Sequence, residues 1–359
     1  MKLQEKIEVF EKLGIFLKQF AFPVHDAKTD LPWLRELNSQ FLQPLEAIIQ
    51  NSNIHNPWFT ENNMRFALGH TGRILNAGNL SEWLGHYDEN AMDRTPKTIA
   101  VVMAGNIPLV GFHDMLCVLI SGHNMLAKLS VKDDQLLKLL SEILYSLDDY
   151  FLGKIEFAGS RLKDFDAVIA TGSNNTSRYF EYYFSKYPSI IRKNRTSVAI
   201  LDGSESPEEL KGLADDVFRY FGLGCRSVSK LYLPAEYDFH KLIEAFNFYS
   251  HLADHNHWAN NYDYQKAIHL IDMIHHLDTG FLIIRNNASL ASPIAVLNYE
   301  NFSKRESALE QLKRESGSIQ CITGNPSLSE GIIPFGKAQE PGLRDYADNI
   351  DTMDFLINL

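Results

Sequence analysis

Short apolar runs that alternate with amphipathic segments constrain the fold of this chain more than any other feature. The runs at 98–104 (TIAVVMA), 124–130 (NMLAKLS) and 165–170 (FDAVIA) are typical of strands buried on both faces of a sheet. Residues 133–150 separate two of them and predict a helix, because leucine and isoleucine recur on one face. Alternation of this kind predicts an α/β fold with a parallel sheet and right-handed crossovers.

The same pattern divides the chain into parts. A helix is predicted at 174–187 and a fourth strand of the first sheet at 197–201, after a mostly helical region that ends near residue 95. Because 359 residues exceed one small domain, we place a boundary near residue 202. The predicted parts are 1–202, 203–335 and a tail, 336–359, that ends in a strand.

Charge and cysteine content exclude several classes of protein. The formal net charge is 34 − 45 = −11, which disfavours nucleic-acid binding. No stretch is long and apolar enough to predict a membrane span. Three widely spaced cysteines form neither a disulfide framework nor a zinc-ribbon pattern, so we expect a reducing, cytoplasmic setting.

Three positions carry the best signals for chemistry. Cys225 lies in FGLGCRS, between a predicted helix and a predicted strand, and the adjacent Arg226 would favour its thiolate. The alternative is a small buried hydrophobe, which is our interpretation of Cys117 and Cys321. Asn106 follows one predicted strand, and the Gly172-Ser173 turn follows another and leads into a helix whose backbone N–H groups can bind phosphate.

Two further patterns have simpler explanations. His251 and His255 are spaced to share one helix face, but no third ligand follows at motif spacing, so we predict no metal site. The aromatic run at 179–187 is interpreted as helix packing rather than as the lining of an acyl channel.

Taken in order, five segments resemble the aldehyde dehydrogenase superfamily: VVMAGNIPLVG (101–111), NMLAKLS (124–130), VIATGS (168–173), FGLGCRSVSKLYLP (221–234) and, more loosely, PFGKAQEPGLRDYAD (334–348). The GNIPLVG segment is most similar to the acyl-CoA reductase (LuxC-type) family. The resemblance implies a Rossmann-type parallel-sheet cofactor domain over 1–202 and a smaller α/β catalytic domain over 203–335. It implies that the tail returns to the cofactor domain or joins an oligomer interface.

The resemblance also assigns roles to residues. Cys225 matches the nucleophile that forms an acyl-enzyme, and Asn106 matches the side-chain donor of the oxyanion hole. Lys128 matches the lysine that binds the adenine ribose, and Gly172 and Ser173 match the pyrophosphate turn. Many NAD-preferring members carry an acid three residues after that lysine.

This chain departs from the superfamily in three respects. The acid is replaced by Val131, followed by Lys132, which favours a 2′-phosphate and therefore NADPH. The glutamate that activates water in hydrolytic members aligns with Ile191, at 225 − 191 = 34 residues before the nucleophile. Unless Glu181 or Asp202 replaces it, water should attack the acyl-enzyme poorly. The usual Glu-x-Phe-Gly-Pro segment has no clear match after Cys225.

The resemblance, taken together with these departures, implies NADPH-dependent reduction of a long-chain acyl-CoA, or of an acyl-protein thioester, to an aldehyde. An acyl-activating enzyme is an expected partner, and a homo-oligomer an expected state. The alternatives are an acyl-phosphate reductase, another aldehyde oxidoreductase of the same fold, or a non-catalytic relative that acts as a binding protein.

Overall fold

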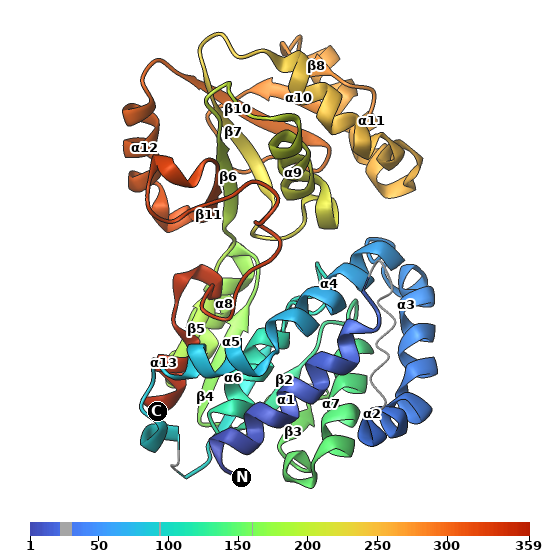
Figure 1. Cartoon of the computed structure of the whole chain (residues 1–359). Coiled ribbons are helices and arrows are strands. Elements are labelled where there is room, and N and C mark those ends of the chain that lie inside the picture. Colours follow the sequence, from blue (N-terminus) through green and yellow to red (C-terminus); the bar gives the residue numbers. More distant parts are fainter. Residues whose placement is uncertain (22–30, 93–94, 160) are drawn as a thin grey trace. The chain divides into compact units, whose positions relative to one another are not determined.

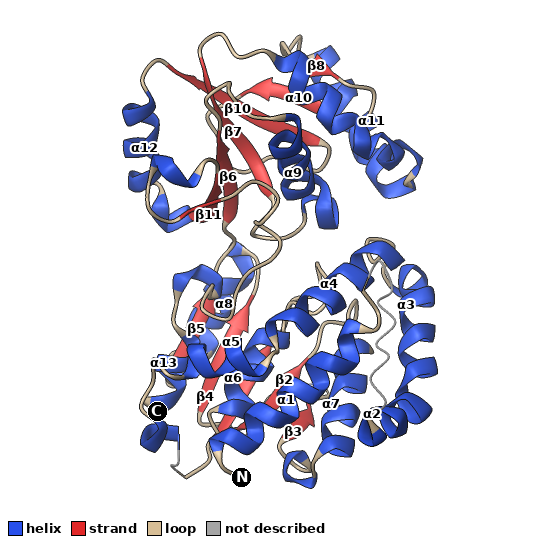
Figure 2. Cartoon of the chain, in the orientation of Figure 1, coloured by secondary structure: helices blue, strands red, loops and turns tan. Residues whose placement is uncertain are grey.

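A computed structural model describes residues 1–21, 31–92, 95–159 and 161–359 (Figure 1). The chain divides into two compact units: Met1–Lys193 with Gly342–Leu359, and Asn194–Pro341. Figure 2 shows that each unit is a sheet with helices packed against it, so the predicted α/β class is confirmed. The predicted borders were residues 202 and 335, and the first differs from the observed one because strand β6 (Thr196–Ile200) belongs to the second unit.

The first unit begins with helices, as the sequence predicts. They are α1 (Leu3–Lys18), α2 (Pro32–Leu37), α3 (Gln43–His55), α4 (Glu61–Ile74) and α5 (Ala77–Leu84), with a π-helical turn at Asn38–Leu42 and a 3-10 turn at Glu89–Met92. One face of α1 is fully buried and contributes Phe10, Leu13, Phe16 and Leu17 to the core. Helices α1 and α4 approach closely at Gly72, where a Cβ atom would lie 2.8 Å from the carbonyl oxygen of Gly14.

A five-stranded parallel sheet forms the centre of this unit, in the order β3-β2-β1-β4-β5. Its strands are β1 (Thr98–Val102), β2 (Asn124–Lys128), β3 (Ile155–Phe157), β4 (Ala167–Thr171) and β5 (Ser189–Arg192). The associated helices are α6 (Phe112–Ile120), α7 (Leu136–Leu147) and α8 (Asn174–Tyr183), with a 3-10 turn at Asp149–Phe151. Strands β1, β2 and β4 confirm predictions. The sequence analysis missed β3 and β5, which are short and contain charged residues.

The second unit is built on a seven-stranded sheet with the order β12-β11-β6-β7-β10-β9-β8, in which only the β8–β9 pair is antiparallel among the described pairs. Its strands are β6 (Thr196–Ile200), β7 (Val228–Pro234), β8 (Leu277–Asp278), β9 (Ile283–Asn286), β10 (Val296–Phe302), β11 (Ile319–Thr323) and β12 (Ile332–Ile333). Its helices are α9 (Pro207–Phe218), α10 (Phe239–Phe246), α11 (Asn256–Ile271) and α12 (Arg305–Arg314).

Strand β6 corrects one prediction. Residues 197–201 were predicted to be the fourth strand of the first sheet. In the structure this strand, β6, pairs with β7 and β11 of the second sheet. The chain therefore changes units after Lys193, ahead of the predicted boundary. The strand itself was recognised correctly, because its apolar pattern is local, whereas its pairing partners lie far away in the sequence.

The tail corrects another prediction. Residues 349–359 do not form a strand; a 3-10 turn (Ala347–Asn349) leads into them, and they contain helix α13 (Thr352–Ile357). Asp351 caps this helix by accepting the backbone N–H of Asp354 at 2.9 Å. The helix buries Met353, Leu356 and Ile357, which recur at helical spacing, and it belongs to the first unit.

Within the described part of the chain, none of the helices combines the length and the apolar character needed to cross a bilayer.

Candidate active site

Four of the predicted site residues of the first unit lie at one edge of its sheet. Asn106 follows β1, Lys128 ends β2, and Gly172 and Ser173 follow β4. Because the order is β2-β1-β4 and all three strands are parallel, their carboxyl ends are neighbours. From β1 the chain first adds β2 and β3 on one side and then β4 and β5 on the other. Open α/β sheets bind ligands at such a topological switch point.

The turn that carries Asn106 is held by contacts on both sides. Its Gly105 packs so closely that a Cβ atom would lie 2.5 Å from Ser130 Oγ, and the Gly105 carbonyl accepts the side-chain N–H of Asn56 at 3.3 Å. The backbone N–H of Leu109, which has a positive φ of 60°, hydrogen-bonds to Asp133. The Asn106 side chain is exposed at the surface of this turn.

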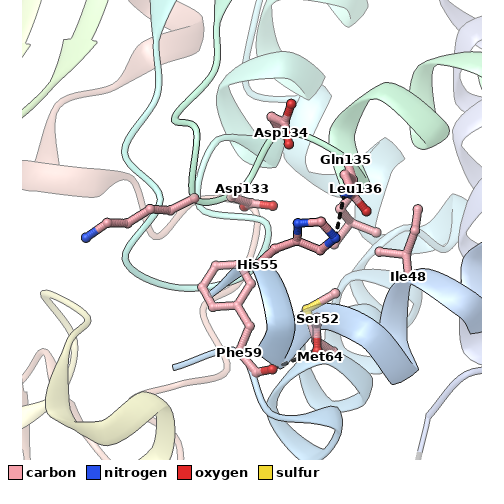
Figure 3. Close-up of a pocket in the computed structure, with 10 residues that line it drawn as sticks. Ile48, Ser52, His55, Phe59, Met64, Asp133, Asp134, Gln135 and Leu136 are labelled. Carbon is pink, nitrogen blue, oxygen red and sulfur yellow. Dashed lines mark hydrogen bonds between the residues drawn. The ribbon is translucent and has the colours of Figure 1, made fainter. Parts of the chain in front are cut away.

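Asp133 is a functional candidate that sequence reasoning missed. It is buried, and burial raises the pKa of its carboxyl to about 7, although the hydrogen bond from Leu109 opposes the shift. Figure 3 shows Asp133 in a pocket lined by residues of α3, α4 and the start of α7. At this pocket the side-chain amide of Gln135 forms a hydrogen bond of 3.1 Å with the ring of His55. Asp133 thus connects the Asn106 turn to the segment after Lys128. The sequence offers no signal for it beyond an acid at a helix start.

The two candidate cofactor lysines are placed differently. Lys128 donates to the carbonyl oxygen of Gly159, in the connection between β3 and β4. Lys132 is exposed beside Val131, whose side chain is 91% exposed. The backbone N–H of Lys132 donates to Ser130 Oγ at 3.3 Å, and among the described residues its amine has no ion pair.

The Gly172-Ser173 turn forms the start of α8. Ser173 is the N-cap, and its hydroxyl oxygen accepts the backbone N–H of Thr176 at 3.2 Å. A Cβ atom at Gly172 would lie 3.0 Å from the side chains of Thr176 and Phe180, so glycine permits this close turn. The first N–H groups of the helix point out of its N-terminus, which favours an anion there.

Cys225 belongs to the second unit and is half-buried. Its loop follows a 3-10 segment, Arg219–Gly222, in which Tyr220, Phe221 and Gly222 have φ angles of 54°, 56° and 69°. Consecutive left-handed non-glycine residues are strained, and such strain concentrates at functional sites. The loop ends where β7 begins at Val228.

Residues 334–339 support this loop. Asp216 of α9 has no exposed surface and accepts the backbone N–H groups of Gly336 (2.8 Å) and Ala338 (2.9 Å). Burial raises its pKa to about 7 against these two hydrogen bonds. Ala338 in turn accepts the Arg226 guanidinium through its carbonyl oxygen. Sequence reasoning missed Asp216, although an acid on the apolar face of a predicted helix is an available signal.

Side chains of this segment and of α9 complete the contact. Gln339 donates to Ser227 Oγ at 3.3 Å. Gly336 has a φ of 81°, and a Cβ atom there would lie 3.0 Å from the Cα atom of Gly212 in α9. Two glycines therefore let the segment lie directly against the helix.

Ile191, which the resemblance matches to the glutamate of hydrolytic members, lies in apolar surroundings. Ile191 lies on β5 and packs against Ala100, Val168 and Ala170. The two acids considered as replacements are engaged elsewhere in ion pairs: Glu181 with Lys193 at 2.8 Å, and Asp202 with Arg305 at 3.1 Å.

The histidine interpretation needs correction. His251 lies in a 3-10 segment, Asn247–Asp254, and His255 is the N-cap of α11, so the two do not share one helix face. The ring of His255 accepts the backbone N–H of Trp258 at 3.3 Å, which is a structural role. Across the described ranges, no group of three or more histidine, cysteine or acidic side chains is arranged to hold a metal ion.

The aromatic run of α8 is divided. Phe180 and Phe184 pack on the sheet, whereas Tyr179, Tyr182 and Tyr183 are between 65% and 77% exposed. Cys117 is fully buried beside His113, and Cys321 is 8% exposed.

The family model described as acyl-CoA reductase (LuxC) matches residues 74–253, a range that contains all six predicted site residues. No curated protein sequence matches the chain significantly.

Several solved structures share the fold. An indole-3-acetaldehyde dehydrogenase from P. syringae, in complex with NAD+ and IAA, has a TM-score of 0.60 and 14% identity, covering 92% of this chain and 74% of that chain. An NAD-dependent aldehyde dehydrogenase from Sinorhizobium meliloti has a TM-score of 0.60 and 11% identity, with coverages of 90% and 70%. Aldehyde dehydrogenase 21 from Physcomitrella patens, with succinate, has a TM-score of 0.58 and 13% identity, with coverages of 90% and 74%. The predicted aldehyde-dehydrogenase-like fold is confirmed.

Proposed function

Because the chain belongs to the acyl-CoA reductase (LuxC) family, we propose that it reduces a long-chain acyl thioester to an aldehyde, with NADPH as the reductant and Cys225 as the nucleophile. The observation that carries this proposal is the setting of Cys225. It is a half-buried thiol in a strained, hydrogen-bonded loop, within the range that the family model matches.

The first chemical step belongs to Cys225. Its thiolate attacks the carbonyl carbon of the substrate thioester, and the bond to the substrate sulfur then breaks, which releases the CoA or protein thiol and leaves an acyl-enzyme. The neighbouring Arg226 favours the thiolate electrostatically. Asn106 donates its side-chain N–H to the developing oxyanion, and the Cys225 backbone N–H is the second donor. Removing one such donor typically lowers kcat by about 10²–10³-fold.

The residues of the first unit fit a dinucleotide. The N-terminus of α8 at Gly172 and Ser173 suits a pyrophosphate, and Lys128 reaches the same edge of the sheet. Lys132 is an exposed cation with no acid at position 131, which suits a 2′-phosphate and therefore NADPH over NADH. Bound NADPH supplies the hydride that reduces the acyl-enzyme. The Cys225 sulfur then leaves as a thiolate, and the aldehyde is released.

Ile191 disfavours hydrolysis of the acyl-enzyme in this proposal. An isoleucine packed against an apolar cluster cannot accept a proton from water. The acyl-enzyme therefore persists until hydride or a thiol attacks it.

The test follows NADPH absorbance in the presence of long-chain acyl-CoA, for the wild type beside Cys225→Ala. We expect oxidation of NADPH by the wild type only, with NADPH binding retained in the variant. Wild-type turnover by Cys225→Ala would refute the nucleophile assignment.

The same assay with an acyl phosphate or an acyl-protein separates the donors. Turnover with acyl phosphate alone would replace the proposal by the acyl-phosphate reductase alternative. Binding of NADPH with no acylation by any donor would favour a non-catalytic relative.

A further inference from the structure

Both peptide groups that flank the Cα atom of Cys225 are held through their carbonyl oxygens. The carbonyl oxygen of Gly224 accepts the backbone N–H of Ser227 at 3.0 Å. The carbonyl oxygen of Cys225 accepts the hydroxyl of Ser197 at 3.0 Å. A peptide group is planar, so fixing each carbonyl also fixes the N–H at the other side of the group. These two bonds together set the direction of the Cys225 N–H and of its side chain.

Ser197 lies on β6, outside the loop that it contacts. It has no exposed surface, so water does not compete for its hydroxyl. Its oxygen accepts the backbone N–H of Cys321 at 3.2 Å, and Cys321 Sγ lies 3.1 Å away. Because the single hydroxyl proton is donated to Cys225, the Cys321 thiol is the donor in the contact between the two side chains. The Ser197 hydroxyl therefore donates to the Cys225 carbonyl oxygen and accepts from both the backbone N–H and the thiol of Cys321, and these three contacts fix its orientation.

The loop is held from another direction as well. Arg226 donates to the carbonyl oxygen of Ala338, and Ser227 accepts from Gln339. These contacts remain when Ser197 is changed. Loss of the Ser197 hydroxyl therefore affects mainly the peptide between Cys225 and Arg226.

We propose that Ser197 is a positioning residue, which orients Cys225 for attack on the thioester and is itself oriented by Cys321. This inference rests on the proposed function, because it requires Cys225 to be the nucleophile. It also gives Cys321 a role beyond that of a core residue.

The experiment measures acylation alone, as the release of CoA thiol from long-chain acyl-CoA in a single turnover without NADPH. Supporting groups of this kind contribute about 10–100-fold to activity, so we expect Ser197→Ala to slow thiol release by that factor. In steady state kcat should fall similarly, while KM for NADPH stays unchanged. Ser197→Thr restores the hydroxyl and should recover most of the rate.

Ser229→Ala is the matched control. Ser229 lies on the adjacent strand β7 and donates to the carbonyl oxygen of Leu290 at 2.7 Å. Its hydroxyl also contacts Thr196 Oγ1 and lies 3.5 Å from the backbone carbonyl oxygen of Ser197, so this variant removes serine contacts next to Ser197 but leaves the bond from the Ser197 hydroxyl to Cys225 in place. We expect its acylation rate to lie within about twofold of wild type, since this variant keeps the hydroxyl that bonds Cys225 and changes mainly the stability of the strand pair. If Ser197→Ala does not fold, Ser197→Cys gives the same test under anaerobic conditions, because its thiol donates only weakly and oxygen must be excluded to keep it from oxidising with the adjacent Cys321.

Two outcomes overturn the inference: wild-type acylation by folded Ser197→Ala, or equal slowing by Ser197→Ala and Ser229→Ala. The Cys225→Ala variant separates this failure from failure of the proposed function. If Cys225→Ala still releases thiol, the nucleophile assignment itself is wrong. If it releases none while Ser197→Ala reacts normally, only the positioning role is wrong.

Discussion

Replacing Asp114 by asparagine should strongly destabilise the first unit, because it removes one partner of a buried ion pair. Asp114 of α6 and Arg192 of β5 are each 5% exposed in their side chains, and Arg192 Nη2 donates to Asp114 Oδ1 at 2.7 Å. The same nitrogen lies 3.0 Å from Thr352 Oγ1 of α13. Burial alone lowers the pKa of the Arg192 guanidinium, but the charge and hydrogen bonds of Asp114 raise it above its usual value.

The magnitude follows from what the variant leaves behind. An asparagine presents one N–H group toward the guanidinium where the carboxylate presented an acceptor, and the arginine charge stays buried. Breaking a buried pair in this way costs about 3–5 kcal/mol. For a folding unit of the size of Met1–Lys193 with Gly342–Leu359, each kcal/mol lowers Tm by roughly 2–4 °C, so we expect the Tm of this unit to fall by roughly 6–20 °C.

Thermal and urea unfolding measure this effect, with Asp134→Asn as the control. Asp134 pairs with Lys138 at 2.8 Å, but both side chains are more than 40% exposed, so its loss should change the free energy of unfolding by less than about 0.5 kcal/mol. The double variant Asp114→Leu/Arg192→Met should be more stable than Asp114→Asn, since it leaves no buried charge. A change below about 1 kcal/mol for Asp114→Asn would refute the reasoning.

Three further predictions follow from other contacts. Burial raises the pKa of Asp216 in the folded chain to about 7, above its ordinary value of 3.8, so the folded state binds this proton more tightly than the unfolded state. The free energy of unfolding that this carboxyl contributes therefore decreases as the pH rises from about 4 to 7. Asp216→Asn should therefore gain stability relative to wild type between pH 5 and pH 8 in urea unfolding; a constant difference would contradict this. Gly336→Ala should lower the free energy of unfolding by about 1–3 kcal/mol, because it adds strain at a φ of 81° and a contact with Gly212. Gly331→Ala, with a φ of 83° and open space, reports the strain alone, and equal losses would exclude the contact. Lys132→Glu should lower the ratio of kcat/KM for NADPH to that for NADH by at least about tenfold through charge repulsion; an unchanged ratio would remove Lys132 from the 2′-phosphate site.

Elements with a local signal can be recognised from the sequence alone. The apolar runs of β1, β2 and β4 and the leucine face of α7 were recognised, because burial on both sheet faces or on one helix face leaves a direct pattern. The order of motifs around Asn106, Gly172 and Cys225 was enough to indicate the family. These motifs lie in turns whose residue types follow from backbone geometry and from the chemistry of the bound groups.

Which elements come together depends on contacts between segments that are far apart in the sequence. The apolar pattern of residues 196–200 is compatible with a strand in either sheet. These residues belong to the second sheet because they pair with β7 and β11, which are distant in the sequence. The tail was predicted as a strand, but Met353, Leu356 and Ile357 bury a helical face against the first unit. The functional candidates Asp133, Asp216 and Ser197 could not be recognised from the sequence for the same reason. Each is an ordinary polar residue in sequence, and its burial and hydrogen-bond partners exist only after distant segments have packed.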